Sequence, residues 1–346
     1  MYFAFALVAL LCWSGSDLFS KMGTSQKDKQ SHWRVVFAVG AIMGIHAILT
    51  LIISPFLPAD TPEWLKTIIY TDFKPIDFIN YLPVASIYII AMVFGYVGLR
   101  YIELSVSSPI CNSSGSLALL ICCLLGWATL TTETIIGVVL ITLGIVGLGI
   151  TDYRENQEAK LARQDKSQFK YTKSLVAILI PIIYLFLDAL GTVGDQMVSE
   201  LSLFEMSDYA SNTAFEFAFV LFAIFAFVWV KFVKKEKFFT LPEDTVLDEK
   251  SLPSAEDNVS KEVTTRKISR KTALLLGSIC ETVGQMFYMA VMFSDFDAGM
   301  PMISAYCVLS VVWSRIFLKE KLSWLHYTCI ALTFIGIILL GIFSPV

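Results

Sequence analysis

Charged residues are scarce in this chain of 346 residues. Asp, Glu, Lys and Arg together make up 16% of it, whereas hydrophobic residues make up 56% and the mean hydropathy is +0.68. A soluble globular domain carries about 25% charged residues, so water is not the solvent for most of this chain. The net charge of -4 offers no basic surface, which argues against nucleic acid as a partner.

Motifs for metals, nucleotides and covalent catalysis are also missing. The seven cysteines show no CxxC and no Cys/His spacing, so we interpret them as helix-packing residues and predict no disulfide framework, metal site or cofactor. No Walker motif or other Gly-rich phosphate loop is present, which argues against direct ATP drive. The chain also lacks a nucleophile with two facing catalytic groups, so we do not predict an enzyme.

Apolar runs of roughly 20 residues, the length that crosses a bilayer core, are abundant. The first has no basic region before it and no small-residue cleavage site after it, which predicts a retained span and not a signal peptide. The pattern predicts an all-α membrane protein with ten transmembrane helices. The ten runs are Tyr2–Lys21, Val35–Ser54, Tyr81–Tyr101, Ser105–Trp127, Thr134–Thr151, Ser174–Met197, Ala210–Lys231, Thr272–Ser294, Met300–Leu318 and Trp324–Phe343.

The stretch 94–150 has an echo 192 positions later, at 286–342. Aligned without gaps, the two copies pair Tyr96 with Tyr288, Pro109 with Pro301, and Gly144 with Gly336. Two copies of one helical unit are typical of transporters with internal repeats. We therefore predict a first repeat at 1–151, a cytoplasmic linker at 152–173 and a second repeat at 174–346.

The basic residues predict the orientation. All but two of the 26 Lys and Arg residues belong to the odd-numbered loops; the exceptions, Lys66 and Lys74, lie in loop two. Because positive charge concentrates on the inner side, we expect odd loops in the cytoplasm and both termini outside, in the plasma membrane. We expect the seventh loop, 232–271, to be a disordered or loosely helical tether, with an interaction tail as the alternative. In loop two, 55–80, the apolar neighbours of Trp64 predict an amphipathic turn on the headgroups.

Glu281 is the most informative polar residue, because it lies near the middle of the eighth run. An ionised side chain there costs ~3 kcal/mol or more unless it faces a cavity or a partner. Gln285 and Tyr288 follow four and seven residues later, on the same helix face. We predict that the three line a substrate or proton pathway; the alternative is a protonated Glu that hydrogen-bonds a neighbouring helix.

Two further helices carry acidic groups. In the seventh, Asn212 and Glu216 are four residues apart among phenylalanines, where an unpaired carboxylate would be costly. In the sixth, Asp188 and Asp195 are two turns apart on one face, some 10 Å along the axis. Gly194 before Asp195 resembles the Gly-Asp pair of intramembrane aspartyl proteases, but two catalytic carboxylates must lie within about 3 Å, which this spacing forbids.

The remaining candidates lie in helices one to four. Asp17 and Lys21 form an i,i+4 pair, in which Lys21 snorkels to the cytoplasmic edge or pairs with Asp17. His46 is a packing residue or a proton relay. Asn112 follows Pro109 where the helix can kink and free its carbonyls. Tyr96, the counterpart of Tyr288, completes the predicted pathway.

A likeness to a known family emerges from the turns. The short turn between helices three and four, Pro109 near the start of the fourth, and the pattern 317–323 (FLKEKLS) followed by Gly336 and Gly341 resemble the EamA-type repeat of the drug/metabolite transporter superfamily. The likeness covers all ten spans. It implies two inverted five-helix repeats, a central cavity lined mainly by helices one, three, four, six, eight and nine, and alternating access.

This resemblance also assigns a role to one loop residue. Glu320 matches the family's Glu at the ninth-to-tenth turn. The first half departs from the pattern, because Ala128 occupies that place and Glu133 lies five residues away. The long seventh loop is a second departure. Family members are often drawn with cytoplasmic termini, whereas the Lys/Arg distribution here favours termini outside.

These features together predict a secondary transporter for a small polar or amphiphilic metabolite. In-membrane acids outnumber bases, which favours cationic or zwitterionic substrates, or carboxylates protonated during coupling to protons. The expected partners are that substrate, the lipid bilayer and protons, and a homodimer is compatible with the sequence. Two alternatives remain: a membrane binding or scaffold protein that transports nothing, and an intramembrane enzyme.

Overall fold

The computed structural model describes residues 2–25, 27–127, 131–155, 160, 175–199, 204–240, 268–292, 303 and 305–343. These residues are helical or lie in loops, and no strand occurs among them. The α-helices are α1 (Tyr2–Gly23), α2 (Ser31–Ile53), α3 (Glu63–Ile69), α4 (Pro75–Gly98), α5 (Leu104–Cys111), α6 (Ser114–Leu124), α7 (Thr132–Arg154), α9 (Leu175–Ser199), α10 (Asp208–Val228), α11 (Arg270–Met292), α13 (Tyr306–Trp313) and α14 (Trp324–Phe343).

Helix length and composition identify a multi-pass membrane protein. In the described part of the chain, seven spans are long and apolar enough to cross a membrane: α1, α2, α4, α5 with α6, α9, α10 and α11. Shorter apolar stretches lie in α7, in α13 with the π-helical turn that follows it, and in α14. Each of the ten predicted runs overlaps a helix in the described part of the chain, and seven of these spans have the length and composition to cross a membrane.

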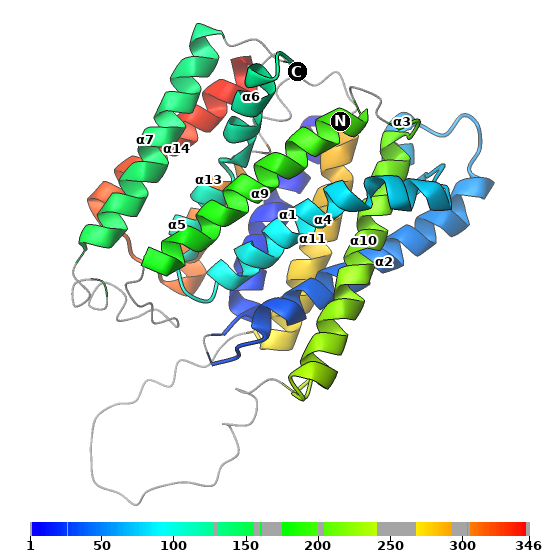
Figure 1. Ribbon diagram of the computed structural model, residues 1–346, viewed down its shortest axis with the longest axis horizontal. Helices are drawn as coiled ribbons and strands as arrows, with labels where there is room; N and C mark the ends of the chain where they lie inside the picture. Colours follow the sequence, from blue (N-terminus) through cyan, green and yellow to red (C-terminus); the bar gives the residue numbers. More distant parts are fainter. Residues whose placement is uncertain are drawn as a thin grey trace, which may run out of the picture.

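Four helix pairs organise the bundle (Figure 1). Helices α2 and α10 pack together along one side, and α7 and α14 along the opposite side. Between them, α1 packs along α11, and α4 along α9. Helices α5, α6 and α13 lie between the α7–α14 pair and the other helices; α13 contacts α1 and α5, and α6 contacts α9 and α7. Each principal pair thus joins a helix from the first half of the chain to one from the second.

Small residues allow these helices to approach closely. At Gly40 of α2, an added Cβ would lie 2.4 Å from the carbonyl oxygen of Phe219 and 2.7 Å from Ala223 of α10. One turn later, a Cβ on Gly44 would lie 2.5 Å from Val220. Lipid tails provide no hydrophobic drive for helix association, so such close packing supplies much of the attraction.

The predicted fourth helix is broken in the middle. Instead of running from Ser105 to Trp127, it ends as α5 at Cys111 and resumes as α6 at Ser114. At the break the amide of Ser113 donates to the carbonyl of Ile110 at 3.2 Å, and its hydroxyl donates to the carbonyl of Pro109 at 2.7 Å. The break places two helix ends within the bundle.

The loops differ from expectation where they can be compared. Residues 232–240 begin the segment predicted as a loose tether, yet Phe238 is buried and its ring lies 4.8 Å from that of Phe37 in α2. Residues 241–267 lie outside the described residues, as does the 152–173 linker except for its first residues and Lys160. Loop two does contain an amphipathic helix, α3, which packs on α11 and α2.

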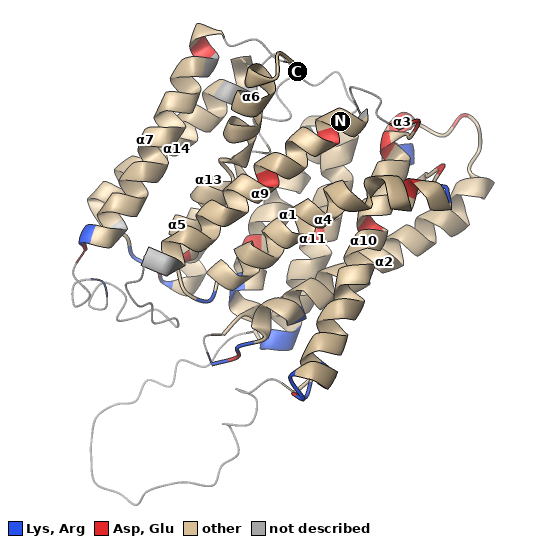
Figure 2. Ribbon diagram, in the orientation of Figure 1, with Lys and Arg blue, Asp and Glu red and all other residues tan. Residues whose placement is uncertain are grey.

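Charge is distributed unevenly along the bundle (Figure 2). Basic side chains gather at the end where α1 leads into α2 and where α10 finishes, which we call the basic end. Helix α3, which contains Lys66, lies at the opposite end (Figure 2), and Lys74 directly precedes α4. Helix α1 begins and α14 finishes at that opposite end (Figure 1).

Replacing Gly40 by Ala should destabilise the protein, because the new methyl group would overlap the backbone of α10. We expect the free energy of unfolding to fall by about 1–3 kcal/mol, measured as a lower melting temperature in detergent. Gly115→Ala is the matched control, since a Cβ there would meet nothing within 4 Å. Equal melting temperatures for the two variants would contradict the close α2–α10 contact.

Candidate functional site

Asp17 connects three helices at the centre of the bundle. Its Oδ2 accepts hydrogen bonds from Ser108 of α5 at 2.6 Å and from Ser310 of α13 at 2.7 Å. The side chain of Asp17 is nevertheless partly exposed. A carboxylate at this depth is therefore held by neutral hydroxyls from two other helices and is still reachable.

Glu281 of α11 lies beside Asp17. It hydrogen-bonds Ser16 and is close enough to Asp17 for the two carboxyl groups to interact electrostatically. The phenol of Tyr96 in α4 is buried within range of both acids, and its hydroxyl has no hydrogen-bond partner among the described residues. The indole nitrogen of Trp13 also has no hydrogen-bond partner among the described residues. Two acids and two unsatisfied donors thus belong to one region.

Aromatic rings cover the acids. The ring of Trp13 lies 4.9 Å from Tyr288 of α11 and 5.7 Å from Tyr306 of α13, measured between centroids. The Trp13 ring rests against Gly284, where a Cβ would come within 2.5 Å of it. Aromatic faces attract cations, so this arrangement suits a positively charged group next to carboxylates.

The two acids of α9 bind different helices. Asp188 accepts a hydrogen bond from Ser114 at the start of α6, at 2.5 Å, and Asp195 accepts one from Tyr81 of α4, at 2.7 Å. Both carboxylates are partly exposed. Tyr288 of α11 lies within electrostatic range of both, so it links the α9 acids to the group on α1 and α11.

We call this set the central polar cluster: Trp13, Asp17, Tyr96, Asp188, Asp195, Glu281, Tyr288 and Tyr306. The amide residues lie around it. Gln285 donates to Asn212 of α10 at 3.3 Å, and Asn112 hydrogen-bonds the thiol of Cys307. The predicted stripe on α11 therefore divides, with Glu281 and Tyr288 facing α1 and Gln285 bonded to α10.

His46 and Glu216 form a separate pair between α2 and α10. Nδ1 of His46 lies 2.7 Å from Oε1 of Glu216, and Nε2 lies 2.8 Å from the carbonyl oxygen of Ile68 in α3. A carbonyl only accepts, so Nε2 carries a hydrogen, and a second proton lies between Nδ1 and the carboxyl group. Glu216 is only 1% exposed. The sequence grouped Glu216 with Asn212, whereas the fold directs each to a different helix.

Buried charges close the basic end. Lys21 is fully buried and donates to the carbonyls of Leu99 and, at 2.9 Å, Ile102. Glu320 accepts from the amides of Leu104 and Ser105, both at 3.2 Å. The snorkelling predicted for Lys21 is wrong, because the carbonyls at the end of α4 attract its ammonium group inward.

An ion pair also belongs to this group of buried charges. Glu103 lies 3.2 Å from Lys160, and both side chains are at most 2% exposed. Glu103 and Lys160 were not predicted, since each resembles an ordinary loop charge. Glu133 is exposed on the first turn of α7, and Ala128 lies outside the described residues.

Helix α3 covers the opposite end. Trp64 packs on Phe5 of α1, with 5.6 Å between ring centroids. Glu63 accepts hydrogen bonds from Lys66 at 2.7 Å and Tyr209 at 3.1 Å, which lower the pKa of this exposed carboxyl group. Tyr209 thereby ties α3 to the start of α10.

In the part of the chain that the structure describes, no three His, Cys, Asp or Glu side chains are grouped so that they could hold a metal ion. All seven cysteines are free thiols; Cys12 of α1 and Cys280 of α11 hydrogen-bond each other, and Cys307 hydrogen-bonds Asn112. A scan against protein-family models and a search of curated proteins both found no match to the chain.

Replacing His46 by Leu should destabilise the fold strongly, because it leaves Glu216 buried without its partner. Breaking a buried pair in this way costs about 3–5 kcal/mol. The double variant His46→Leu/Glu216→Leu should recover most of the loss, since no buried charge remains. Thermal unfolding of the single and double variants measures both effects; additive losses would show that the two side chains do not depend on each other.

Proposed function

We propose that this protein is a secondary transporter that moves a small cationic or zwitterionic metabolite across the membrane by alternating access, coupled to protons. The observation that carries the proposal is the central polar cluster, in which acids from α1, α9 and α11 hydrogen-bond serines of other helices and lie within electrostatic range of shared tyrosines. Polar groups inside a membrane protein usually serve a substrate or ion pathway.

The helix pairing supports ten spans in two inverted repeats. In this scheme the first repeat contains α1, α2, α4, α5 with α6, and α7, and the second contains α9, α10, α11, α13 and α14. Exchanging equivalent helices converts the α1–α11 pair into the α9–α4 pair, and converts α2–α10 and α7–α14 into themselves. An odd number of spans per repeat inverts the second repeat. This is the architecture implied by the resemblance to the drug/metabolite transporter superfamily.

The charge distribution supports the orientation. The basic end faces the cytoplasm of a plasma-membrane protein in this proposal, because positively charged loops are retained inside (Figure 2). The start of α1 and the finish of α14 then lie outside.

The chemistry of the central polar cluster favours a substrate with an ammonium group. Asp17 and Glu281 supply negative charge, and the rings of Trp13, Tyr288 and Tyr306 supply a surface for the cation. The unsatisfied donors of Tyr96 and Trp13 suit an acceptor oxygen on the same molecule. A zwitterion satisfies both requirements at once. Protonation of Asp17 or Glu281 would remove the negative charge that holds the ammonium group of the substrate, and so would release it.

The two ends of the bundle support alternating access. Lys21 and Glu320 fix the turn between α4 and α5 at the basic end, while α3 lies across the other end. At each end, a few polar contacts hold the bundle closed. A rocking motion of the two repeats can break these contacts and form them again. A scaffold that transports nothing would need neither closure nor accessible acids.

Glu281→Gln should abolish proton-coupled flux while leaving folding intact, because the amide keeps the shape but cannot take up a proton. Ligands are first found by screening small amines, amino acids and organic acids for a rise in melting temperature at two pH values, since a bound ligand stabilises the folded state. Flux of a hit is then measured in proteoliposomes, with Glu133→Gln, at an exposed position of α7, as the control. Unchanged flux and pH dependence in Glu281→Gln would remove this residue from the mechanism, and a panel without hits would favour the scaffold.

Glu320→Ala should loosen the basic end, because the first amides of α5 lose their acceptor. Losing a helix cap costs ~1 kcal/mol, so the open population should rise roughly fivefold. The readout is labelling of Ser108→Cys, in a background without native cysteines, by a membrane-impermeant thiol reagent added at the basic end. Glu133→Ala in the same background is the control, and identical labelling rates would mean that Glu320 does not hold this end shut.

A further inference from the structure

A cleft of about 350 Å³ opens at the basic end, away from the central polar cluster. It lies between the loop from α1 to α2 and the chain that follows α10. Its lining residues are Lys27, Asp28, Lys29, Arg34, Glu236, Lys237 and Thr240. Basic side chains exceed acidic ones among them, so the cleft is suited to an anion.

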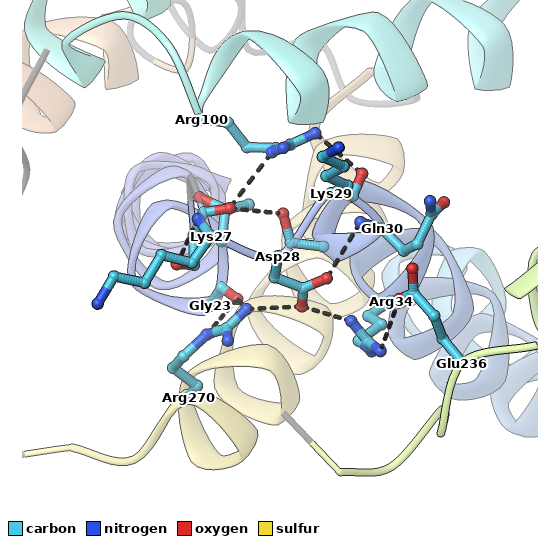
Figure 3. Close-up of polar contacts among 12 residues, drawn as sticks. Gly23, Lys27, Asp28, Lys29, Gln30, Arg34, Arg100, Glu236 and Arg270 are labelled. Carbon is cyan, nitrogen blue, oxygen red and sulfur yellow. Dashed lines mark hydrogen bonds and ion pairs between the residues drawn. The ribbon is translucent and has the colours of Figure 1, made fainter. Parts of the chain in front are cut away.

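Asp28, one of the two acids that line this cleft, already accepts hydrogen bonds from other residues (Figure 3). Asp28 is buried and its Oδ2 accepts from Arg34 and, at 3.0 Å, from Arg270 of α11. Its Oδ1 accepts from the backbone amide of Gln30 at 3.0 Å. The second acid, Glu236, lies 3.9 Å from Arg34. Two arginines therefore compensate the acidic charge of the cleft.

Three lysines remain free to bind a ligand. Lys27, Lys29 and Lys237 are all exposed, and none of them forms an ion pair with another described residue. They come from two segments about 200 residues apart, which the fold brings to one cleft. Their positive charge has no protein partner there among the described residues.

A second cleft of about 350 Å³ continues from the first, sharing Glu236, Lys237 and Thr240 with it. Aromatic rings form its walls, and its other lining residues are Phe227, Lys231, Lys235, Phe238 and Phe239. Phe239 is 65% exposed and Phe232 nearby is 60% exposed. An apolar groove thus adjoins a cationic cleft.

The position of the clefts along the bundle suits the headgroup layer. The apolar span that contains α10 runs from Asp208 to Val233, 26 residues, or about 39 Å of helix. The hydrocarbon core is about 30 Å thick, so the last turns of this span emerge among the headgroups. The clefts lie beside those turns.

The platform that carries the clefts is rigid. Arg34 donates to the carbonyl oxygens of Phe238 at 2.8 Å and Lys237 at 3.1 Å. Lys235 adopts a positive φ of 55°, which turns the chain back toward α2. The lysines and aromatic rings are therefore presented in a fixed arrangement before any ligand binds.

We propose that the paired clefts bind one anionic phospholipid of the adjacent leaflet. The headgroup phosphate sits against Lys27, Lys29 and Lys237, and an acyl chain lies along Phe227 and Phe239. Basic clusters next to membrane spans attract anionic lipids; the apolar groove joined to the cationic cleft favours a lipid over a soluble anion. The inference depends on membrane insertion but not on transport.

Titrating the detergent-solubilised protein with phosphatidylglycerol tests the proposal, with bound lipid counted by native mass spectrometry and the melting temperature as a second readout. Phosphatidylglycerol should bind and raise the melting temperature, whereas phosphatidylcholine should do neither. Each lysine removed should weaken binding roughly fivefold, so Lys27→Gln/Lys29→Gln/Lys237→Gln should bind about a hundredfold less tightly. Phe239→Ser should also weaken lipid binding.

The matched control is Lys66→Gln/Lys74→Gln, which removes basic charge from the opposite end and should leave lipid affinity unchanged. The substituted lysines are exposed or half-buried, so all variants should melt like the wild type without lipid. Three results would overturn the proposal: equal binding of phosphatidylcholine, unchanged binding by the triple variant, or an equal stabilisation by inorganic phosphate alone. The last result would identify the cleft as a site for soluble anions.

Discussion

No water reaches the hydrocarbon core of a bilayer, so a polar group in a membrane protein must find its partner inside the fold. This constraint accounts for most of the side-chain contacts in the bundle. Asp17, Asp188 and Asp195 each accept a hydrogen bond from a hydroxyl on another helix. Because these bonds cross between helices, satisfying the acids also fixes the helices against one another. The same hydrogen bonds therefore contribute to the stability of the bundle.

At the basic end, the polar backbone groups where α4 finishes and α5 begins also have partners inside the fold. The last carbonyls of α4 carry partial negative charge and the first amides of α5 carry partial positive charge. Lys21, from α1, meets the carbonyls, and Glu320, from near the end of the chain, meets the amides. Two distant segments thus converge on one tight turn with the charges that its dipoles require. Residues that resemble surface charges in the sequence are among the most buried in the protein.

The sequence predicted the helices well, because hydropathy and span length depend on local composition. The sequence also singled out Asp17, Glu281 and Asp188; each hydrogen-bonds a serine of another helix, and their role in a pathway stays a prediction. The sequence could not predict which residue each polar side chain contacts. His46 and Glu216 lie 170 residues apart, and nothing in the spacing of either run shows that α2 packs on α10. The burial of Lys21 depended on the carbonyls of α4, which no composition rule describes.

The interruption between α5 and α6 has an electrostatic consequence of its own. Midway through the fourth span, the carbonyl end of α5 and the amide end of α6 meet at Asn112 and Ser113. Each terminus carries roughly half an elementary charge, of opposite sign, and Ser114 at the amide end already binds Asp188. These backbone dipoles are permanent and do not titrate. They would orient a dipolar solute within the bundle even when every acidic side chain is neutral.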